Sequence, residues 1–330
     1  MYKNKRAIFI TALVLSLVLC LGLLYGCGGG SPGVPSPSAL PSVPLPSRPN
    51  INPPSPTPTP SPTQTSDHSV SLYAVIVGIA DYPYPNALNY ADKDGRDFYN
   101  SLRQSSLWNG AFAATLYNSD ATKANIKKYM DDAASKLTED GMFVFFYSGH
   151  GSNSNGLGQL VSYPVNGAYE YVNENEMQAW LSALPSTSKK YVAIDSCYSG
   201  LFIGKGYYYK KQNNITPKFI KQESSDSNFK GDFITKSLSS IENMAAITAC
   251  AGDELSYETS DLQSGVMTYF LVQGIGSGTI IGPAGSGGVV TAEGSYDYAS
   301  PAIASYAGIN DFVQTLQIKD NYSGDMTIKN

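Results

Sequence analysis

From about residue 70 onward, short apolar runs alternate with stretches in which apolar residues recur at helical spacing. Runs such as VIVGI and FVFFY lack polar alternation, which is typical of strands buried on both faces of a parallel sheet. The pattern therefore predicts an α/β fold with a mostly parallel central sheet covered by helices. We expect strands near Tyr73–Ala80, Ala111–Tyr117, Met142–Tyr147, Tyr191–Ile194 and Met244–Thr248, and helices near Ala91–Leu102, Thr122–Leu137, Glu176–Leu184 and Gly265–Gln273.

Two segments interrupt this alternation. Residues 201–240 are rich in lysine, asparagine and serine, and residues 274–288 are rich in glycine and serine. Long segments without secondary structure inside a compact domain are commonly functional or disordered. We predict an exposed loop at each of them.

The N-terminus has the layout of a secretory signal, with Lys3, Lys5 and Arg6 ahead of an apolar run that ends near Tyr25. The four residues that end at Cys27 resemble a bacterial lipobox. This resemblance implies that residues 1–26 are removed, that Cys27 is lipidated, and that the protein is exported and anchored to a membrane of the bacterial cell envelope. The alternative is an uncleaved membrane helix, since the apolar run is nearly long enough to span a bilayer.

Residues 27–67 form a segment dominated by proline, serine and threonine. Such a composition cannot bury a core and favours extended polyproline II structure. We interpret it as a disordered linker ahead of a domain at 68–330, with a proline-rich ligand for a partner domain as the alternative.

The charge and the cysteine content of the chain argue against two classes of protein, those that bind nucleic acid and those held together by disulfides. The chain has 22 Lys and Arg against 27 Asp and Glu, so nucleic acid is not an expected partner. Cys20 lies in the signal segment, which leaves Cys197 and Cys250 in the domain and no disulfide framework. A single disulfide between these two remains an alternative, although it would consume any nucleophile.

One histidine and one cysteine stand directly after predicted strands, His150 in GMFVFFYSGHG and Cys197 in YVAIDSCYSG. The other histidine, His68, lies in the linker region, so His150 is the one candidate base for a thiol nucleophile. Ligands of such sheets gather at the carboxyl ends of the strands, where both residues are expected. The N–H groups of Gly151 and Cys197 are then candidates to stabilise an oxyanion. Taken singly, either residue could equally be a packed thiol or a histidine that holds a loop.

The two motifs, about 50 residues apart, resemble the caspase-like cysteine peptidases, which include caspases, metacaspases and many bacterial members. YAVIVGIADYP and LNYADKDGRDFYNSL resemble the first strand and helix of the family, and ITACAGDELSYE and GVMTYFLVQGI resemble segments after its nucleophile. The resemblance covers roughly residues 73–273. It implies a caspase-like sheet of about six strands with helices on both faces, a His150–Cys197 dyad and endopeptidase activity.

Two aspartates, Asp195 and Asp94, indicate which kind of substrate residue the site would bind. If the strand stays extended to Cys197, Asp195 lies on the same side as the thiol. Asp94 has helical spacing with Ala91 and Phe98, which places it on the apolar face of its helix. Together they would select a cation, and the resemblance to metacaspases implies cleavage after Arg or Lys. The alternatives are that Asp195 orients a turn and that Asp94 caps its helix or pairs with a nearby base, Arg96 or Lys93.

No cofactor is expected. Calcium-dependent metacaspases carry an aspartate-rich segment after the histidine, and here that stretch contains only Glu170, Glu174 and Glu176. A calcium ion is usually bound by several oxygen ligands, most of them carboxylates. A calcium site in this segment is therefore possible but unsupported. The expected partners are peptides or proteins with basic residues.

Self-cleavage is a further hypothesis, because the loop at 201–240 carries seven lysines that such an enzyme would accept: Lys205, Lys210, Lys211, Lys218, Lys221, Lys230 and Lys236. The alternative is a solvated loop without such a role. For the protein as a whole, two other functions stay open, a catalytically inactive caspase-like surface module that binds peptides or proteins, and a structural envelope protein.

Overall fold

The computed structural model describes residues 69–83, 85–204, 216–218, 238–276 and 288–330. The predicted signal segment, Cys27, the linker, and most of the loops at 201–240 and 274–288 lie outside the described residues. Among the described residues, no helix combines the length and the apolar character needed to cross a membrane.

A six-stranded sheet forms the centre of the domain, in the order β13-β9-β7-β3-β1-β2. Five neighbouring strands are parallel, and only β13 at one edge is antiparallel to its neighbour. This confirms the predicted α/β class with a mostly parallel sheet. The strands are β1 (Val70–Gly78), β2 (Phe112–Tyr117), β3 (Leu137–Ser148), β7 (Lys189–Asp195), β9 (Met244–Thr248) and β13 (Gln317–Asp320).

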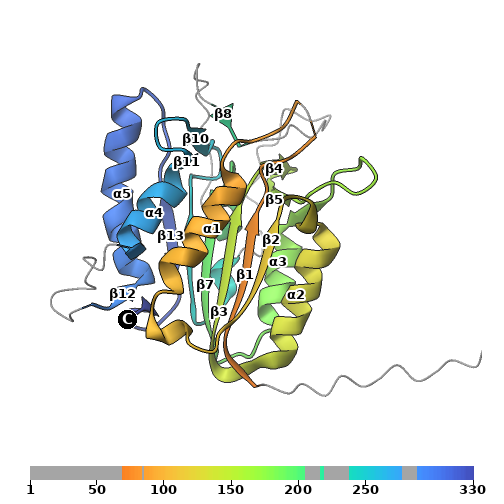
Figure 1. The fold of residues 1–330 in the computed structure, drawn as a ribbon, viewed down its shortest axis with the longest axis vertical. Coiled ribbons are helices and arrows are strands. Elements are labelled where there is room, and N and C mark those ends of the chain that lie inside the picture. Colours follow the sequence, from red (N-terminus) through yellow and green to blue (C-terminus); the bar gives the residue numbers. More distant parts are fainter. Residues whose placement is uncertain (1–68, 84, 205–215, 219–237, 277–287) are drawn as a thin grey trace, which may run out of the picture. The chain divides into compact units, whose positions relative to one another are not determined.

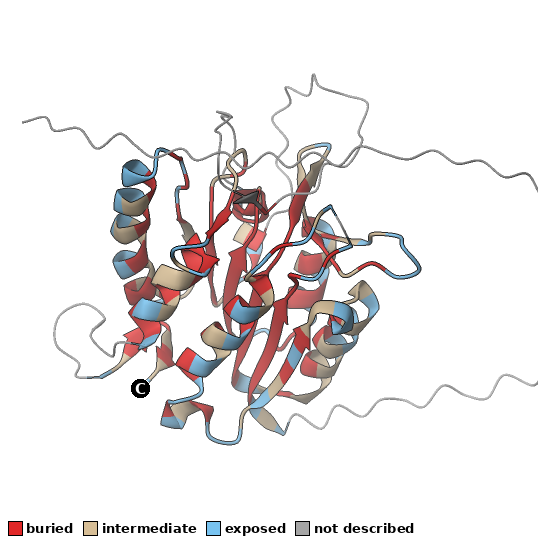
Figure 2. Ribbon diagram, turned by 45° about the horizontal axis from the view of Figure 1, so that its top comes forward, coloured by how far each residue is buried: buried red, intermediate tan, exposed pale blue. Residues whose placement is uncertain are grey.

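Helices cover both faces of this sheet (Figure 1). One face carries α2 (Lys123–Lys136) and α3 (Glu174–Ser182), and the other carries α1 (Ala91–Leu102), α4 (Val266–Gly276) and α5 (Ala292–Ile309). The buried strands lack a polar face, and the helices turn their buried side toward them (Figure 2). Two hydrophobic clusters result, one on each face of the sheet.

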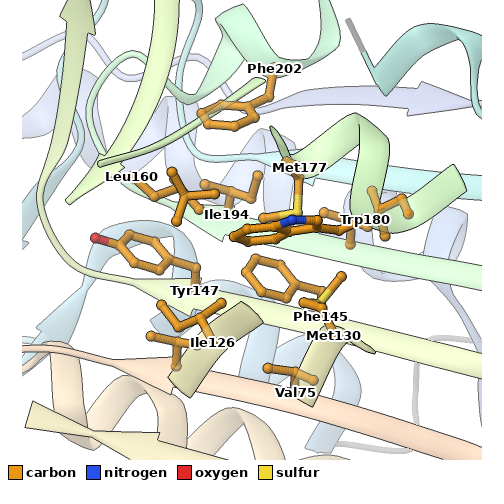
Figure 3. Packing of buried hydrophobic residues seen from close by; sticks show 14 of the residues in the cluster. Val75, Ile126, Met130, Phe145, Tyr147, Leu160, Met177, Trp180, Ile194 and Phe202 are labelled. Carbon is orange, nitrogen blue, oxygen red and sulfur yellow. The ribbon is translucent and has the colours of Figure 1, made fainter. Parts of the chain in front are cut away.

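The cluster under α2 and α3 shows how the strands are held (Figure 3). Met130 from α2 and the pair Met177 and Trp180 from α3 pack over Phe145 of β3 and Ile194 of β7. The helix α3 starts at a capping box between Asn173 and Glu176, which satisfies free N–H groups in its first turn. Packing from this side fixes β3 and β7, the two strands that lead to the candidate site.

Small antiparallel sheets lie at the carboxyl ends of the central strands, at the top of Figure 1. One contains β4 (Gly151–Ser154), β5 (Leu157–Val161) and β6 (Tyr171–Asn173). The other contains β8 (Thr216–Pro217), β10 (Tyr257–Thr259) and β11 (Ser264–Gly265). The remaining elements are the pair β12 (Val290–Thr291) and β14 (Thr327–Lys329), and the 3-10 helices η1 (Ser106–Trp108), η2 (Asn118–Asp120), η3 (Ser199–Ile203) and η4 (Leu238–Ser240).

The structure corrects the sequence interpretation at two places. Helix α5, strand β13 and the β4–β5–β6 sheet were not predicted. The segment 201–240 is not exposed throughout, because Leu201, Phe202 and Ile203 are buried in η3 and Lys218 is completely buried. The first three residues are apolar, Phe202 and Ile203 belong to the core cluster under α2 and α3, and Lys218 has buried charged partners.

Candidate active site

The register between β3 and β7 brings the two predicted site residues together. Ser148 pairs with Asp195 at the last position of both strands, and the N–H of Gly149 donates to the carbonyl oxygen of Asp195 at 3.3 Å. His150 and Cys197 each follow two residues later. Their chain segments pack closely, since a Cβ placed on Gly151 would collide with the carbonyl oxygen of Cys197. Only glycine fits at this contact.

His150 is held by the hydroxyl groups of two buried tyrosines. Its N–H donates to Tyr82 at 3.2 Å, and its carbonyl oxygen accepts from Tyr147 at 2.7 Å. The imidazole packs on the ring of Tyr82, with centroids 4.6 Å apart, and its Nε2 lies 2.6 Å from the carbonyl oxygen of Asn86. Because a carbonyl only accepts, Nε2 must carry the proton. Nδ1 is therefore the nitrogen left to act as a base.

The protonation state of His150 suits that role. Burial lowers its pKa from the usual 6.5 to about 4, although the main-chain groups of Asn86 and Lys218 raise the pKa and the Lys218 charge lowers it. The side chain is therefore neutral at pH values near 7. Nδ1 is buried and has no hydrogen-bond partner among the described residues, so its lone pair is available to accept a proton.

Cys197 lies in the turn after β7, ahead of Tyr198, whose φ of 60° is in the left-handed region. That conformation is unusual for a residue with a side chain and marks a sharp turn at the thiol. Burial raises the pKa of Cys197 well above its ordinary value, and the nearby Cys250 raises the pKa further, while the Ser256 main chain and the Lys218 charge lower it. The thiol is therefore protonated in this state and needs a base to react.

The predicted link between Asp195 and Cys197 holds for a different reason from the one the sequence indicated. The strand ends at Asp195, so the two side chains do not share an extended segment. They are joined instead through Ser256, which was not predicted. Its hydroxyl donates to Asp195 at 2.6 Å, and its N–H donates to the sulfur of Cys197 at 3.3 Å.

Asp94 and Asp195 are completely buried and share one ammonium group, that of Lys218. The Nζ of Lys218 lies 3.1 Å from Asp94, 3.4 Å from Asp195 and 2.8 Å from the Ser148 hydroxyl. The predicted alternatives for Asp94 do not apply, because no side chain caps the start of α1, Arg96 pairs with Asp92 and Lys93 pairs with Asp97.

The two carboxylates are also held by neutral donors. Asp94 accepts from the hydroxyl of Ser264 at 2.6 Å and from the N–H of Gly265 at 3.0 Å. Asp195 accepts from the N–H and the hydroxyl of Thr268, at 3.1 and 2.7 Å, near the start of α4. Asp195 thus binds main chain at the start of α4, which is distant in the sequence, and not a turn beside it as the alternative for this residue expected. Held in this way, the two carboxylates bind the cation of Lys218.

The main chain of Lys218 also forms hydrogen bonds with residues of the site. Its carbonyl oxygen accepts from the N–H of Gly151 at 2.9 Å and from the N–H of Cys197 at 3.4 Å, and its own N–H donates to the carbonyl oxygen of Ser256 at 3.0 Å. The two N–H groups that the sequence singled out as oxyanion donors therefore point at one carbonyl oxygen. Burial would lower the pKa of the Lys218 ammonium, but Asp195 and Asp94 raise it above the usual value.

Glu258 was also missed, although it holds the segment whose Asn86 contacts the His150 ring. Its carboxylate is buried and accepts from the N–H groups of Asn89 and Tyr90, at 2.7 and 3.1 Å. These residues follow Asn86 in the segment that binds the His150 ring. A single acidic residue in a three-residue strand carries no sequence signal for this role.

The glutamates considered for calcium have structural roles or face solvent. Glu174 accepts the N–H of Gly158, Glu176 pairs with Lys123 at 2.6 Å, and Glu170 is exposed. Within the described part of the chain, no group of three or more histidine, cysteine, aspartate or glutamate side chains is arranged to hold a metal ion.

Part of the chain matches a known protein family. Residues 71–280 match the family model described as the caspase domain, Peptidase_C14. Among solved structures, the protein GSU0716 from Geobacter sulfurreducens is 19% identical, with a TM-score of 0.52 and coverage of 75% of this chain and 92% of that chain. The Drosophila initiator caspase Dronc is 12% identical, with a TM-score of 0.49 and coverage of 80% and 85%.

No curated protein shows a significant match to the chain. At its level of identity, the likeness to the Geobacter protein supports the fold alone. The caspase-domain model is the stronger finding, because it spans more than half of the sequence and includes both motifs of the site. This chain belongs to the caspase-domain family of cysteine peptidases.

Proposed function

We propose that the protein is a cysteine endopeptidase that cuts peptide bonds after lysine or arginine, with Cys197 as the nucleophile and His150 as the general base and acid. One observation carries the assignment. A single lysine residue lies with its carbonyl oxygen between the N–H groups of Gly151 and Cys197 and with its ammonium group between Asp94 and Asp195. A peptide whose basic residue binds in this way presents its carbonyl to the thiol.

The protonation states define the first chemical step. The thiol of Cys197 is protonated and His150 is neutral, so Nδ1 takes the thiol proton as the sulfur attacks the carbonyl carbon. Negative charge then develops on the carbonyl oxygen, and the N–H groups of Gly151 and Cys197 stabilise it. One such donor typically contributes about 10²–10³-fold in rate.

The second half of the reaction uses the same groups. The protonated imidazole gives its proton to the departing amine, and the thioester of Cys197 remains. Water then attacks the thioester as His150 removes its proton, which releases the carboxylate and restores the thiol. The hydrogen bond from Nε2 to Asn86 keeps the ring in the tautomer that both halves require.

The two carboxylates set the specificity in this proposal. An ammonium or guanidinium group meets two carboxylates at once, Asp94 and Asp195. The hydroxyl and N–H groups that bind these carboxylates already offset the free-energy cost of removing them from water. An aspartate side chain in the pocket would place a third carboxylate against Asp94 and Asp195, which is strongly unfavourable. We therefore expect discrimination against acidic residues at the cleaved position.

The test measures cleavage of four fluorogenic peptides that differ only in their last residue, Lys, Arg, Gln or Asp, by the purified full chain over time. We expect cleavage of the Lys and Arg peptides, and a loss of about 10⁴-fold or more in Cys197→Ala. Cys250→Ala, which removes the other buried thiol of the domain, should retain activity. Activity that survives in Cys197→Ala, or cleavage of the Asp peptide in preference to the Lys peptide, would refute the assignment.

A further inference from the structure

Glu258 joins two parts of the candidate site that are far apart in the sequence. It lies in β10, where its main chain is paired with Thr216 of β8, and its side chain is only 3% exposed. One carboxylate oxygen accepts from the N–H and the side-chain amide of Asn89, at 2.7 and 2.8 Å. The other oxygen accepts from the N–H of Tyr90 at 3.1 Å. Three donors therefore converge on one buried carboxylate, an arrangement that fixes main chain strongly.

The segment that Glu258 holds carries the hydrogen-bond acceptor of the base. Residues 85–90 form no helix or strand, so their main chain depends on individual hydrogen bonds for its position. Within this segment, the carbonyl oxygen of Asn86 accepts the Nε2 proton of His150 at 2.6 Å. The bonds to Glu258 begin at Asn89, only three residues beyond that carbonyl. The position of the carbonyl oxygen therefore depends on the Glu258 carboxylate.

That carbonyl oxygen decides which nitrogen of His150 can act as the base. A neutral imidazole has one N–H, and the nitrogen without it accepts the proton. Nδ1 has no partner of its own among the described residues, so no contact there favours either form. The acceptor opposite Nε2 favours the tautomer in which Nδ1 is free. If the carbonyl of Asn86 moved away, the proton could occupy either nitrogen.

We propose that Glu258 is a positioning residue for the reaction: it holds the carbonyl oxygen of Asn86 against Nε2 of His150 and so keeps Nδ1 ready to accept the thiol proton of Cys197. The role in catalysis rests on the proposed function, whereas the effect on the tautomer follows from the geometry. Because β8 pairs with β10, the base is supported from the same strand against which the segment 216–218 lies.

A purely structural role is the alternative. The same carboxylate lies at the start of α1, where a negative charge is favourable and free N–H groups need acceptors. In that case, loss of Glu258 would lower the stability of the fold and leave the His150 tautomer as it is. The segment would then be held well enough by its other bonds, such as that from the N–H of Leu88 to the carbonyl oxygen of Ala80 at 2.8 Å. The tautomer separates the two roles.

The experiment records NMR spectra that correlate ring nitrogens with ring protons, on the full chain labelled with isotope-enriched histidine. The chain has two histidines, and His68→Gln identifies the signals of the other one. At pH values near 7 we expect a single tautomer for His150 in the wild type, with the proton on Nε2. In Glu258→Ala we expect a mixture in which the Nδ1–H form is populated.

The same variant is tested on a Lys-ended fluorogenic peptide. We expect kcat to fall by about 10-fold or more in Glu258→Ala, because a well-placed general base contributes about 10²–10⁴-fold in rate. KM should change by less than about threefold, since the main chain of β10 and the carboxylates of Asp94 and Asp195 are retained.

Two further variants calibrate these results. Glu258→Gln keeps the size of the side chain, but whichever way its amide is turned, one main-chain N–H faces an NH₂ group that cannot accept. We expect a smaller share of the Nδ1–H form and a kcat between those of the wild type and Glu258→Ala. Glu293→Ala is the matched control, because this carboxylate also lies at a helix start, that of α5, and accepts the N–H of Met326 at 2.9 Å. It should lower stability but keep the wild-type spectrum and kcat.

The outcomes separate this inference from the proposed function. A proton on Nδ1 in the wild type, or a single Nε2–H tautomer in Glu258→Ala, refutes the inference and leaves the peptidase assignment standing. A mixture of tautomers with the wild-type kcat refutes the role in catalysis. If circular dichroism shows that Glu258→Ala does not fold, Glu258→Gln decides by the same two measurements. A wild type that cleaves no Lys or Arg peptide refutes the proposed function, and the spectra still decide whether Glu258 sets the tautomer.

Discussion

At the scale of single residues, Gly265 forms the wall of the cation pocket. A Cβ at this position would collide with Asp195, with the ammonium group of Lys218 and with Asp94. Its N–H also donates to Asp94. The absence of a side chain therefore creates the space in which a basic residue binds, and this role is invisible in the sequence, where Gly265 simply precedes a helix.

We predict that Gly265→Ala lowers kcat/KM for Lys and Arg peptides by about 100-fold or more, because one methyl group fills the position of the ammonium group and the lost ion pairing costs several kcal/mol. Alkylation of Cys197 by the small reagent iodoacetamide should continue, since this reagent does not need the pocket. Gly276→Ala at the end of the following helix, α4, where a Cβ meets no atom within 4 Å, is the control. Normal kinetics in Gly265→Ala would contradict the assigned pocket.

At the scale of elements, α5 shows how tertiary packing overrides local preference. The helix contains Gly294, Pro301 and Gly308, all of which weaken an isolated helix. Thr291 caps its start by accepting the N–H of Gly294, at 3.0 Å. Its buried face, which includes Ile303, joins the cluster that covers the sheet opposite α2 and α3. Burial of that face supplies the stability that the local sequence does not.

Two isoleucines of α5 test this account. Ile303 is completely buried, whereas Ile309 is 80% exposed. We predict that Ile303→Ala lowers the free energy of unfolding by about 2–5 kcal/mol, because it leaves a cavity in the core. Ile309→Ala should change it by less than about 0.5 kcal/mol. Urea unfolding followed by circular dichroism gives both values, and equal effects of the two variants would show that α5 does not dock as described.

At the scale of the whole molecule, we propose that the peptidase domain is exported and held on the bacterial cell envelope by a lipid on Cys27. The basic start, the apolar run and the cysteine that follows it support this proposal. The proline-rich residues 27–67 would then separate the domain from the membrane. An extended polyproline segment rises by about 3.1 Å per residue and acts as a stiff spacer.

Cys27→Ser in the full chain tests the anchor. In a bacterial host that processes lipoproteins, we predict that the wild type incorporates a labelled fatty acid and sediments with membranes. The variant should lose the label. Because lipid attachment is separate from the proposed catalytic machinery, cleavage of a Lys-ended fluorogenic peptide should proceed at an unchanged rate in the variant. A label that remains in Cys27→Ser would contradict the assignment of this cysteine.

Much of the framework could be predicted from the sequence, because it depends on local pattern. Continuous apolar runs identified the five parallel strands, and helical spacing identified α1 with the boundaries that the structure has. His150 and Cys197 were candidates because both directly follow predicted strands and a thiol nucleophile needs a base, and the other histidine, His68, is far from any strand end. The sequence also placed Asp94 on a buried helix face, where the structure has it.

The rest was decided by contacts between segments distant in the chain, which no local pattern contains. Ser256, Gly265 and Lys218 lie far along the sequence from His150, and they reach the site because β10, β11 and β8 pair beside the ends of the central strands. Lys218 was one lysine among seven in its loop until tertiary structure placed its charge between two buried carboxylates. The sequence alone determined which groups could react, and the pairing of strands determined which peptide lies against them.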